Sequence, residues 1–413
     1  MIDIKLIREN PELLKESLKR RGEEVRVVDT ILELDKRRRE RIKELDGIRH
    51  KRKELSREIA RSGSRIKMDR ASQLKKEEKE LERGLSEIEV ELRKRLLSLP
   101  NIPHPSVQDK DEIVYESEEK PQFDFKPLTH WDLGEALGIL DFKSASKLSG
   151  SRFVVYKGEG ARLARALINF CLDTHIREHR YLEVYPPILA KEECFWGAGE
   201  FPNLISDVYK CKDDPLYLIP TAETLLVNLH QGEILKEEDL PKYYVAYTPC
   251  FRREAGSYGR DVRGMIRVHQ FDKVELVKYT LPEESYSELE KLLKDAIRIV
   301  KLLGLPYRVK LLSAKEMAFQ SAKTYDIDVW AAGVGRWLEV SSVSNCEDFQ
   351  ARRNNTKLRR KDGRIDYPHI LNGSGIAFAR TFVALIENNQ ERDGSIKIPE
   401  PLRPYMDGKE KIE

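Results

Sequence analysis

The sequence predicts an α+β protein: a pair of long antiparallel helices, followed by a domain built on an antiparallel β-sheet flanked by helices. Three observations predict this. The first hundred residues contain few Gly and Pro and repeat apolar side chains at helical spacing. LPNIPHPSV, residues 99–107, then places three prolines where a helix cannot continue. Beyond it, short apolar runs often follow one another without helices between them, which favours antiparallel strands over a parallel βαβ array.

The first region is predicted to form a helical hairpin over about residues 28–98. Apolar side chains from Ile31 to Ile59, and again from Leu74 to Leu96, recur mostly at spacings of three, four, seven or eight. The Gly- and Ser-containing stretch at 61–72 suits the turn between them. Because neither helix can bury its apolar stripe alone, we expect the two to pack as an antiparallel coiled coil.

Charge is unevenly distributed along the 413 residues, of which 40% are hydrophobic and 35% charged. Residues 1–100 carry 29 Lys and Arg against 22 Asp and Glu, while the rest carry 45 against 49. This basic balance, with the runs KRRR at 36–39 and KRK at 51–53, favours a polyanionic partner such as nucleic acid. A dimerisation or spacer coiled coil with solvated charges is the alternative for this region taken alone.

Several classes of protein are disfavoured. The five cysteines are scattered without a C-x-x-C pair, as expected for reduced thiols in a cytoplasmic protein. We expect no leader peptide in MIDIKLIREN, and no apolar run approaches membrane-spanning length. Neither G-x-x-x-x-G-K-[ST] nor G-x-G-x-x-G occurs, so phosphate binding would depend on arginines and a metal ion.

TPCFRREAGSYGRDVRGMIRVHQFDKVEL, residues 248–276, combines arginines with apolar strand-like positions. We interpret it as antiparallel strands joined by the loop 254–264, with Ile266–Phe271 and Lys273–Lys278 as separate strands. Arg252 would then sit on a rigid sheet, where its fixed fork of donors matches phosphate oxygens, and Phe271 could stack on a base. A hairpin with surface salt bridges is the alternative for the segment taken alone.

This segment resembles motif 2 of the class II aminoacyl-tRNA synthetases, specifically of the seryl-tRNA synthetase family. LPNIPHPSV is similar to that family's junction between tRNA-binding arm and catalytic domain, and YLEVYPP (181–187) resembles the end of motif 1 at its dimer interface. GAGEFPN (197–203), IPTAE (219–223), LEVSSVSNCEDFQARR (338–353) and the motif 3-like LNGSGIAFARTFVALIENNQ (371–390) follow in the family's order. The resemblance covers essentially the whole chain. It implies an arm at 1–105, a linker at 106–128 and a class II catalytic domain at 129–413.

The resemblance also implies an activity. L-serine and ATP would form seryl-adenylate, and the seryl group would pass to tRNA(Ser), and also to tRNA(Sec), without a covalent enzyme intermediate. Alignment of the reactants and charge stabilisation would supply the catalysis. The implied partners are tRNA, bound by the basic arm, and a second copy of the chain in a homodimer. The implied cofactor is Mg²⁺ with ATP, and no structural zinc is expected.

The implied catalytic residues are Arg252, for the α-phosphate and the serine carboxylate, and Arg380, for the γ-phosphate of a bent ATP. The implied Mg²⁺ ligands are Glu339 and Ser342, whose oxygens suit a hard cation. The full implied ATP-binding set is Arg252, Arg253, Glu254, Val268, Phe271, Glu339, Val340, Ser341, Ser342 and Arg380. The implied serine-binding set is Thr221, Ala222, Glu223, Arg252, Glu275, Asn372 and Ser374. Glu275 is the expected acceptor for the serine hydroxyl, so alanine would leave a buried acceptor unpaired.

The chain departs from the family pattern at Tyr258 and Val262 in the motif 2 loop and at Ala379, where glycine is frequent. The first two departures bear on contacts to the end of the tRNA. Three alternatives stay open: a tRNA-binding paralogue without activity, the family's zinc-dependent variant, and a carrier-protein ligase. The TAE sequence and the lack of a Cys/His cluster disfavour the zinc variant, and the helical arm disfavours the carrier-protein ligase.

Overall fold

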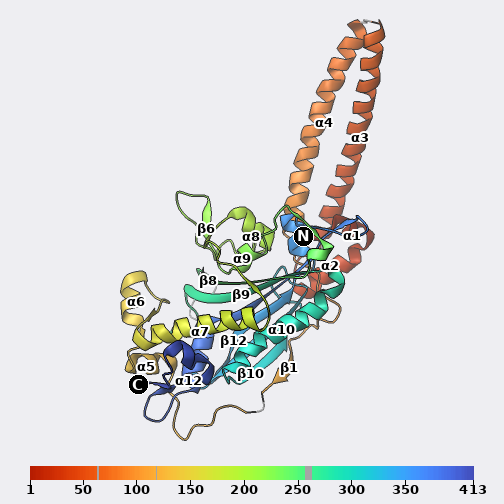
Figure 1. Cartoon of the computed structure of the whole chain (residues 1–413). Coiled ribbons are helices and arrows are strands. Elements are labelled where there is room, and N and C mark those ends of the chain that lie inside the picture. Colours follow the sequence, from red (N-terminus) through yellow and green to blue (C-terminus); the bar gives the residue numbers. More distant parts are fainter. Residues whose placement is uncertain (63–64, 118, 256–262) are drawn as a thin grey trace. The chain divides into compact units, whose positions relative to one another are not determined.

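The computed structural model describes residues 1–62, 65–117, 119–255 and 263–413. It divides into two compact units, Met1–Ile102 and Pro103–Glu413 (Figure 1). None of the described helices is long and apolar enough to cross a membrane.

Within its described residues, the regular elements of the first unit are the helices α1 (Ile4–Glu9), α2 (Pro11–Arg21), α3 (Val27–Ser62) and α4 (Arg65–Leu97). The side chain of Asn10 caps α2 by accepting the Leu13 N–H at 3.2 Å. The long helices α3 and α4 run side by side as the predicted antiparallel hairpin (Figure 1). Helix α4 begins at Arg65, within the stretch 61–72 expected to contain the turn.

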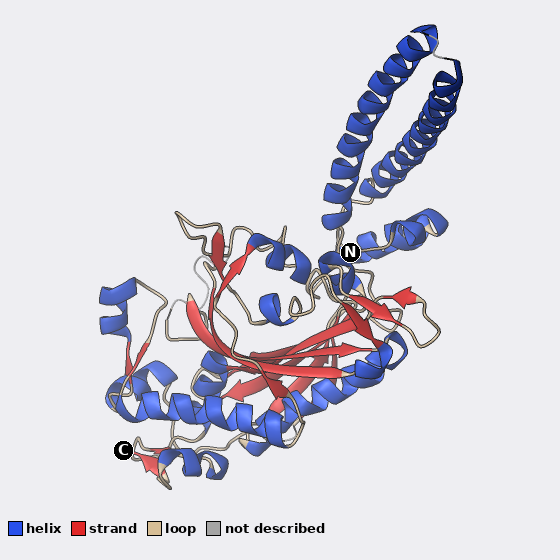
Figure 2. Ribbon diagram, turned by 45° about the horizontal axis from the view of Figure 1, so that its top comes forward, coloured by secondary structure: helices blue, strands red, loops and turns tan. Residues whose placement is uncertain are grey.

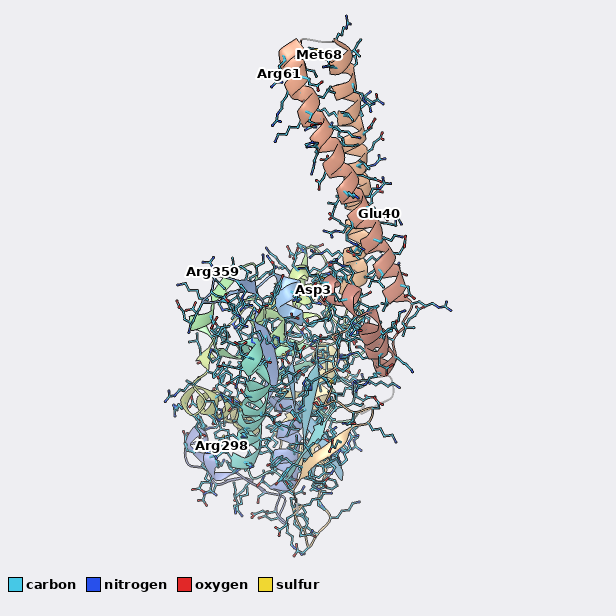
Figure 3. All side chains as sticks on the ribbon, turned by 90° about the vertical axis from the view of Figure 1, so that its right-hand side faces the viewer. Asp3, Glu40, Arg61, Met68, Arg298 and Arg359 are labelled. Atoms are coloured by element: carbon cyan, nitrogen blue, oxygen red, sulfur yellow. The ribbon has the colours of Figure 1, made fainter. Side chains whose placement is uncertain are left out.

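The hairpin holds together through a narrow apolar seam and ion pairs across it. The buried seam residues match the predicted stripes and are Ile31, Leu34, Leu45, Leu74, Ile88, Leu92 and Leu96. Arg49 pairs with Glu82 at 2.9 Å and with Glu78 at 3.2 Å across the two helices. Most other charged side chains project outward along the hairpin, up to its end near Arg61 and Met68 (Figure 3). Much of the basic charge is therefore displayed on the surface.

The second unit is built on an eight-stranded sheet in the order β1-β10-β11-β12-β15-β9-β8-β4. Its strands are β1 (Glu112–Glu116), β4 (Leu182–Glu183), β8 (Lys242–Phe251), β9 (Gln270–Thr280), β10 (Tyr307–Leu311), β11 (Lys323–Ala331), β12 (Arg336–Asn345) and β15 (His369–Ala377). Neighbouring strands are antiparallel, except that β4 runs parallel to β8. The predicted α+β class and antiparallel sheet are confirmed. The stretch 106–128, expected as a linker, contributes the edge strand β1.

Helices pack on one face of this sheet and smaller elements on the other (Figure 2). The first face carries α7 (Gly158–Arg177), α10 (Ser285–Leu302) and α12 (Phe378–Asn388), whose apolar sides form the main core with the sheet. The other face carries α8 (Glu192–Ala198), α9 (Glu223–Leu226), β5 (Leu189–Lys191) and β6 (Leu216–Leu218). The site lies between the sheet and this second group.

The remaining elements are short and lie around the sheet. They are α5 (His130–Ala136), β2 (Leu140–Asp141), α6 (Phe142–Ser149), β3 (Val155–Tyr156), β7 (Ile234–Lys236), η1 (Glu237–Asp239), η2 (Pro282–Glu284), α11 (Phe349–Asn354), β13 (Lys357–Arg359), β14 (Ile365–Asp366), β16 (Ile396–Lys397), η3 (Glu400–Met406) and β17 (Lys411–Ile412). Strands β13, β14 and β7 form a small separate sheet.

The prediction of separate strands at Ile266–Phe271 and Lys273–Lys278 is wrong. One strand, β9, runs from Gln270 to Thr280 and pairs with β8 from Gln270, opposite Phe251, onward. Ile266 and Val268 precede it and are buried in an irregular segment, which gives the same apolar alternation as a strand. The predicted loop 254–264, with Tyr258 and Val262, lies mostly outside the described residues.

Candidate active site

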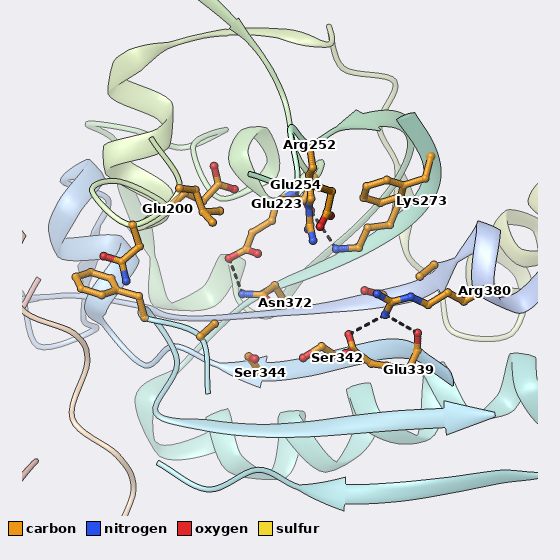
Figure 4. Close-up of a pocket in the computed structure, with 18 of the residues that line it drawn as sticks. Glu200, Glu223, Arg252, Glu254, Lys273, Glu339, Ser342, Ser344, Asn372 and Arg380 are labelled. Carbon is orange, nitrogen blue, oxygen red and sulfur yellow. Dashed lines mark hydrogen bonds and ion pairs between the residues drawn. The ribbon is translucent and has the colours of Figure 1, made fainter. Parts of the chain in front are cut away.

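A cavity of about 610 Å³ lies over strands β9, β12 and β15 of the second unit (Figure 4). Its other walls come from residues 199–204, from the start of α9, and from the loop Met317–Gln320. Eleven of the expected site residues line it: Thr221, Glu223, Arg252, Glu254, Val268, Phe271, Glu339, Ser342, Asn372, Ser374 and Arg380. The structure therefore gathers most of the residues predicted from scattered motifs into one cavity.

A β-bulge brings Glu339 and Ser342 to the same side of β12. In a regular strand, residues three apart point to opposite faces. Here Glu339 pairs with Asp328 of β11 and Ser341 with Ile327, so Val340 is an extra residue between consecutive pairs. The extra residue shifts the alternation by one, and both side chains reach the cavity (Figure 4).

A second bulge acts in the same way in β15. Ser374 pairs with Glu275 of β9 and Ile376 with Val274, which leaves Gly375 as the extra residue. Asn372 and Ser374 share a face by ordinary alternation, and Ala377 joins them in the cavity wall because of the bulge.

The two expected catalytic arginines enter the cavity from different elements (Figure 4). Arg252 follows the end of β8, donates from Nε to the Pro220 carbonyl at 3.4 Å, and lies 5.3 Å from the centroid of the Phe271 ring. Arg380, in the first turn of α12, donates from Nε to the Ile266 carbonyl at 3.3 Å and from Nη1 to the Glu339 carbonyl at 2.9 Å. Backbone contacts hold both side chains, as required for a preorganised anion site.

Glu223 is the most strongly held carboxylate of the site. Its Oε1 accepts hydrogen bonds from three side-chain amides: Gln320 at 3.1 Å, Gln350 at 2.8 Å and Asn372 at 2.9 Å. Burial, with the charge of Glu275 nearby, raises the pKa of Glu223 to about 7. The amides fix the orientation of the carboxyl group.

Glu275 lies next to the lining residues Lys273 and Ser374 but is fully buried and does not itself line the cavity. Its Oε2 accepts from the Thr221 hydroxyl at 2.7 Å and pairs with Lys273 Nζ at 2.5 Å. Its Oε1 is buried and has no hydrogen-bond partner among the described residues. A buried acceptor of this kind is costly unless a ligand supplies a donor.

Four other expected residues do not line the cavity. Arg253 is exposed, and Ala222, Val340 and Ser341 are buried. The Ser341 hydroxyl donates to the Ser374 carbonyl at 2.6 Å, so it braces β12 against β15.

Sequence reasoning missed several residues of this site, above all Glu200, although the motif GAGEFPN that contains it was recognised. Glu200 lines the cavity and is 3% exposed. Its Oε1 accepts from the Thr224 hydroxyl at 2.7 Å, and its Oε2 has no hydrogen-bond partner among the described residues. Burial, followed by the charge of Glu223, raises the pKa of Glu200 to about 8. Lys273, Gln320 and Gln350 were also missed, because nothing in their local sequence indicates what they approach.

An antiparallel sheet with one arginine at the end of β8 and another at the start of α12 defines the core of a class II aminoacyl-tRNA synthetase. Residues 209–389 match the family model "tRNA synthetase class II core domain (G, H, P, S and T)", and residues 1–103 match "Seryl-tRNA synthetase N-terminal domain". A protein named serine–tRNA ligase from Thermotoga neapolitana is 52% identical, with 98% of each chain covered. Another from Thermodesulfovibrio yellowstonii is 50% identical, with 98% of this chain and 99% of the relative covered. The chain belongs to the seryl-tRNA synthetase family.

Solved structures agree. A seryl-tRNA synthetase from Pyrococcus horikoshii, crystallised with ATP, is 40% identical with a TM-score of 0.94, and the match covers 100% of this chain and 99% of the other. A cytoplasmic serine–tRNA ligase from Naegleria fowleri, in complex with AMP, is 29% identical with a TM-score of 0.90 over 100% and 99% of the two chains. The family expected from the motifs is confirmed.

Proposed function

We propose that this chain activates L-serine with ATP in the cavity over β9, β12 and β15 and transfers the seryl group to tRNA(Ser). The observation that carries the proposal is the convergence of two braced arginines and the buried Glu223 on one cavity, with the buried Glu275 hydrogen-bonded to Thr221 of its lining. The arginines suit the phosphates and the carboxylate of serine, and the carboxylates suit its ammonium and hydroxyl groups.

ATP would occupy the part of the cavity between Arg252 and Arg380. Arg252 would bind the α-phosphate together with the serine carboxylate, and Arg380 the γ-phosphate. Phe271, which already lies against the Arg252 guanidinium, would stack on adenine, with Glu254 and Val268 at the base edge. Because the side chains of Arg253, Val340 and Ser341 lie outside the cavity wall, any contact of theirs with ATP would come from the main chain.

Mg²⁺ would be held by Glu339 and Ser342. The carboxylate and hydroxyl oxygens of this pair fit a hard cation, and the bulge at Val340 points both into the cavity. Among the residues described, no three His, Cys, Asp or Glu side chains are grouped to hold a metal, so phosphate oxygens and water would complete the shell. The ion would neutralise phosphate charge as pyrophosphate leaves.

Serine would bind beside Thr221, with its ammonium group facing Glu223 and its hydroxyl donating to the unpartnered Oε1 of Glu275. Ala222, Asn372 and Ser374 complete the expected pocket, and Asn372 also holds Glu223 at 2.9 Å. The pocket discriminates against alanine because, with alanine bound, Glu275 Oε1 stays buried without a donor.

The reaction would proceed in two displacements. A serine carboxylate oxygen attacks the α-phosphorus, the bond to the bridging oxygen of pyrophosphate breaks, and pyrophosphate leaves. A hydroxyl of the terminal tRNA ribose then attacks the seryl carbonyl carbon and gives up its proton to the leaving phosphate or to water. The mixed-anhydride bond breaks, and AMP leaves with its electron pair. The protein contributes alignment and charge stabilisation without a covalent bond of its own.

The remaining parts of the proposal concern partners. The basic hairpin of α3 and α4 would bind the tRNA backbone, and tRNA(Sec) would be accepted together with tRNA(Ser). A homodimer is supported by the strongly exposed Leu182 and Tyr185 in YLEVYPP, which are 63% and 87% exposed in the single chain. A cytoplasmic location would follow from this role.

ATP–pyrophosphate exchange measured with each amino acid in turn tests the proposal. Serine alone should support strong exchange, and Arg252→Ala should abolish it while leaving the fold, followed by circular dichroism, unchanged. A chain without serine-dependent exchange would be the inactive paralogue, and near-normal exchange by Arg252→Ala would remove this arginine from the site. Stoichiometric bound zinc would instead favour the zinc-dependent variant.

A further inference from the structure

The fully buried His130, in helix α5, links the motif 3 helix to the segment that precedes β9. Helices α5 and α12 lie beside each other (Figure 1). Both His130 and Glu387 of α12 have no solvent exposure. Glu387 Oε1 accepts from the His130 backbone N–H at 2.8 Å and lies 2.7 Å from the ring nitrogen Nδ1. On the other side of the ring, the Met265 backbone N–H donates to Nε2 at 3.1 Å.

These contacts determine the protonation of the ring. Nε2 accepts a hydrogen bond from a backbone N–H, so it carries no proton. Nδ1 therefore carries the proton of the neutral ring and donates it to Glu387. The second oxygen of Glu387 accepts from the Val334 N–H at 3.0 Å, so the carboxylate is itself fixed. The imidazole thus acts as a rigid spacer, with a donor on one side and an acceptor on the other.

The residues on either side of this link also fit closely. Gly264 has φ +80°, and a Cβ atom there would lie 2.1 Å from His130 Nε2 and 2.6 Å from Trp131 Cε3. Only glycine combines this backbone conformation with this approach. Arg263 lies 5.0 Å from the centroid of the Trp131 ring.

Asp132 extends the contact by one more residue, since Arg263 Nη2 lies 3.3 Å from its Oδ1. Residues 130–132 thus contact residues 263–265 through consecutive positions. We call residues 263–265 the anchored segment.

The anchored segment leads directly into the proposed ATP site. Ile266, which follows it, lines the cavity and presents its carbonyl to Arg380 Nε at 3.3 Å. Arg267 also lines the cavity and donates to Glu254 at 2.5 Å, and Val268 completes this wall. A displacement of the Met265 backbone would therefore move the expected adenine contacts and a support of Arg380 together. The serine side of the cavity, around Thr221 and Glu275, is held by other elements.

We propose that His130 is a positioning residue for ATP, which it serves by holding the Met265 N–H and with it the wall formed by residues 266–268. The inference rests on the proposed ATP site. It differs from a role in core packing alone, because a packing role would lower stability without separating the kinetic constants for the two substrates.

Two substitutions of His130 in the full-length chain test the hydrogen bonds to Glu387 and to Met265 one at a time. Asn is short, so His130→Asn can still donate to Glu387 but cannot reach Met265. Gln is longer, so the carbonyl of His130→Gln can take the place of Nε2 and accept from Met265. In serine-dependent ATP–pyrophosphate exchange, we expect His130→Asn to raise the KM for ATP about tenfold, as for the loss of one buried hydrogen bond, and to change the KM for serine less than about twofold. His130→Gln should restore most of the ATP affinity.

A matched control and a second perturbation complete the design. His369→Ala removes a ring contact elsewhere in this unit, from Nδ1 of the half-buried His369 to the Ser285 hydroxyl at 2.8 Å, and should leave the ratio of the two KM values unchanged. Gly264→Ala pushes on the same contact from the other side and should also raise the KM for ATP selectively. If His130→Asn does not fold, Gly264→Ala still tests whether this contact positions ATP.

The outcomes are distinct. If the folded His130→Asn or Gly264→Ala protein keeps the wild-type KM for ATP, or if both KM values rise equally, the positioning role is wrong while the ATP site stands. If Arg252→Ala retains full exchange, the proposed ATP site fails and this inference fails with it.

Discussion

Glu200→Gln is a substitution for which the structure predicts a strong dependence of stability on pH. Burial raises the pKa of Glu200 to about 8, so the folded protein favours the neutral acid. At about 1.4 kcal/mol per pH unit, ionisation of this group in the folded chain costs up to about 5 kcal/mol relative to an ordinary glutamate. That contribution to stability is fully present below pH ~4.5, the pKa of the unfolded chain, and is lost as the pH rises to about 8.

The order of stability of the substituted protein and the wild type should reverse as the pH rises. Gln keeps an acceptor for the Thr224 hydroxyl but places an NH₂ group where Glu200 Oε2 has no partner among the described residues, which costs about 1–3 kcal/mol at every pH. Gln cannot ionise, so it avoids the loss above. Glu200→Gln should therefore be less stable than wild type at pH 5 and more stable at pH 9.

Thermal unfolding followed by tryptophan fluorescence measures this difference. All four tryptophans lie between residues 131 and 337, so the signal reports on the second unit. At roughly 2 °C per kcal/mol, the difference in Tm between variant and wild type should change by up to about 10 °C from pH 5 to pH 9. The exposed Glu193 nearby supplies a control, since Glu193→Gln should show a flat difference. A flat difference for Glu200→Gln would refute the reasoning.

Three further predictions test other parts of the site. Glu275→Gln should raise the KM for serine at least about tenfold while the KM for ATP changes little, because the amide has one acceptor oxygen where the carboxylate has two. Equal changes of the two KM values in pyrophosphate exchange would contradict this role. Deletion of residues 28–98 should spare serine-dependent exchange and abolish tRNA charging, and retained aminoacylation by the truncated chain would exclude the arm from tRNA binding. Glu339→Gln combined with Ser342→Ala should increase the Mg²⁺ concentration needed for half-maximal exchange about tenfold or more; an unchanged Mg²⁺ titration would place the ion elsewhere.

The helical hairpin could be predicted in detail, because its apolar spacing is a property of consecutive residues. Ile31 and Leu34 on α3 are buried as that spacing requires, and so are Ile88 and Leu92 on α4. The start of β9 could not be placed, since an irregular buried segment and a strand show the same alternation. Pairing with β8, a property of two segments, decides where the strand begins.

The site could be predicted only as far as local motifs extend. Arg252 and Arg380 lie in the motif 2-like and motif 3-like segments, so the resemblance alone identifies them. Gln320 and Gln350 hold Glu223 from 97 and 127 residues away in the chain. Gln320 lies outside the quoted motifs, and the motif 338–353 that contains Gln350 does not indicate this contact. Glu200 presents the same difficulty: its unusual character comes from burial, which depends on the packing of α8 and α9 above the sheet.

The two bulges explain why a site with such spacing is compatible with a sheet at all. Glu339 and Ser342 are three residues apart, a spacing that a regular strand would send to opposite faces, one of them into the core beneath. A charged carboxylate on the core face would need a partner there. The extra residue Val340 removes this conflict within β12, and Gly375 does the same for the wall of β15. By shifting the alternation of side chains by one residue, each bulge lets a strand supply both a packed face and closely spaced polar residues. The bulges are therefore part of the site, together with the side chains that they orient.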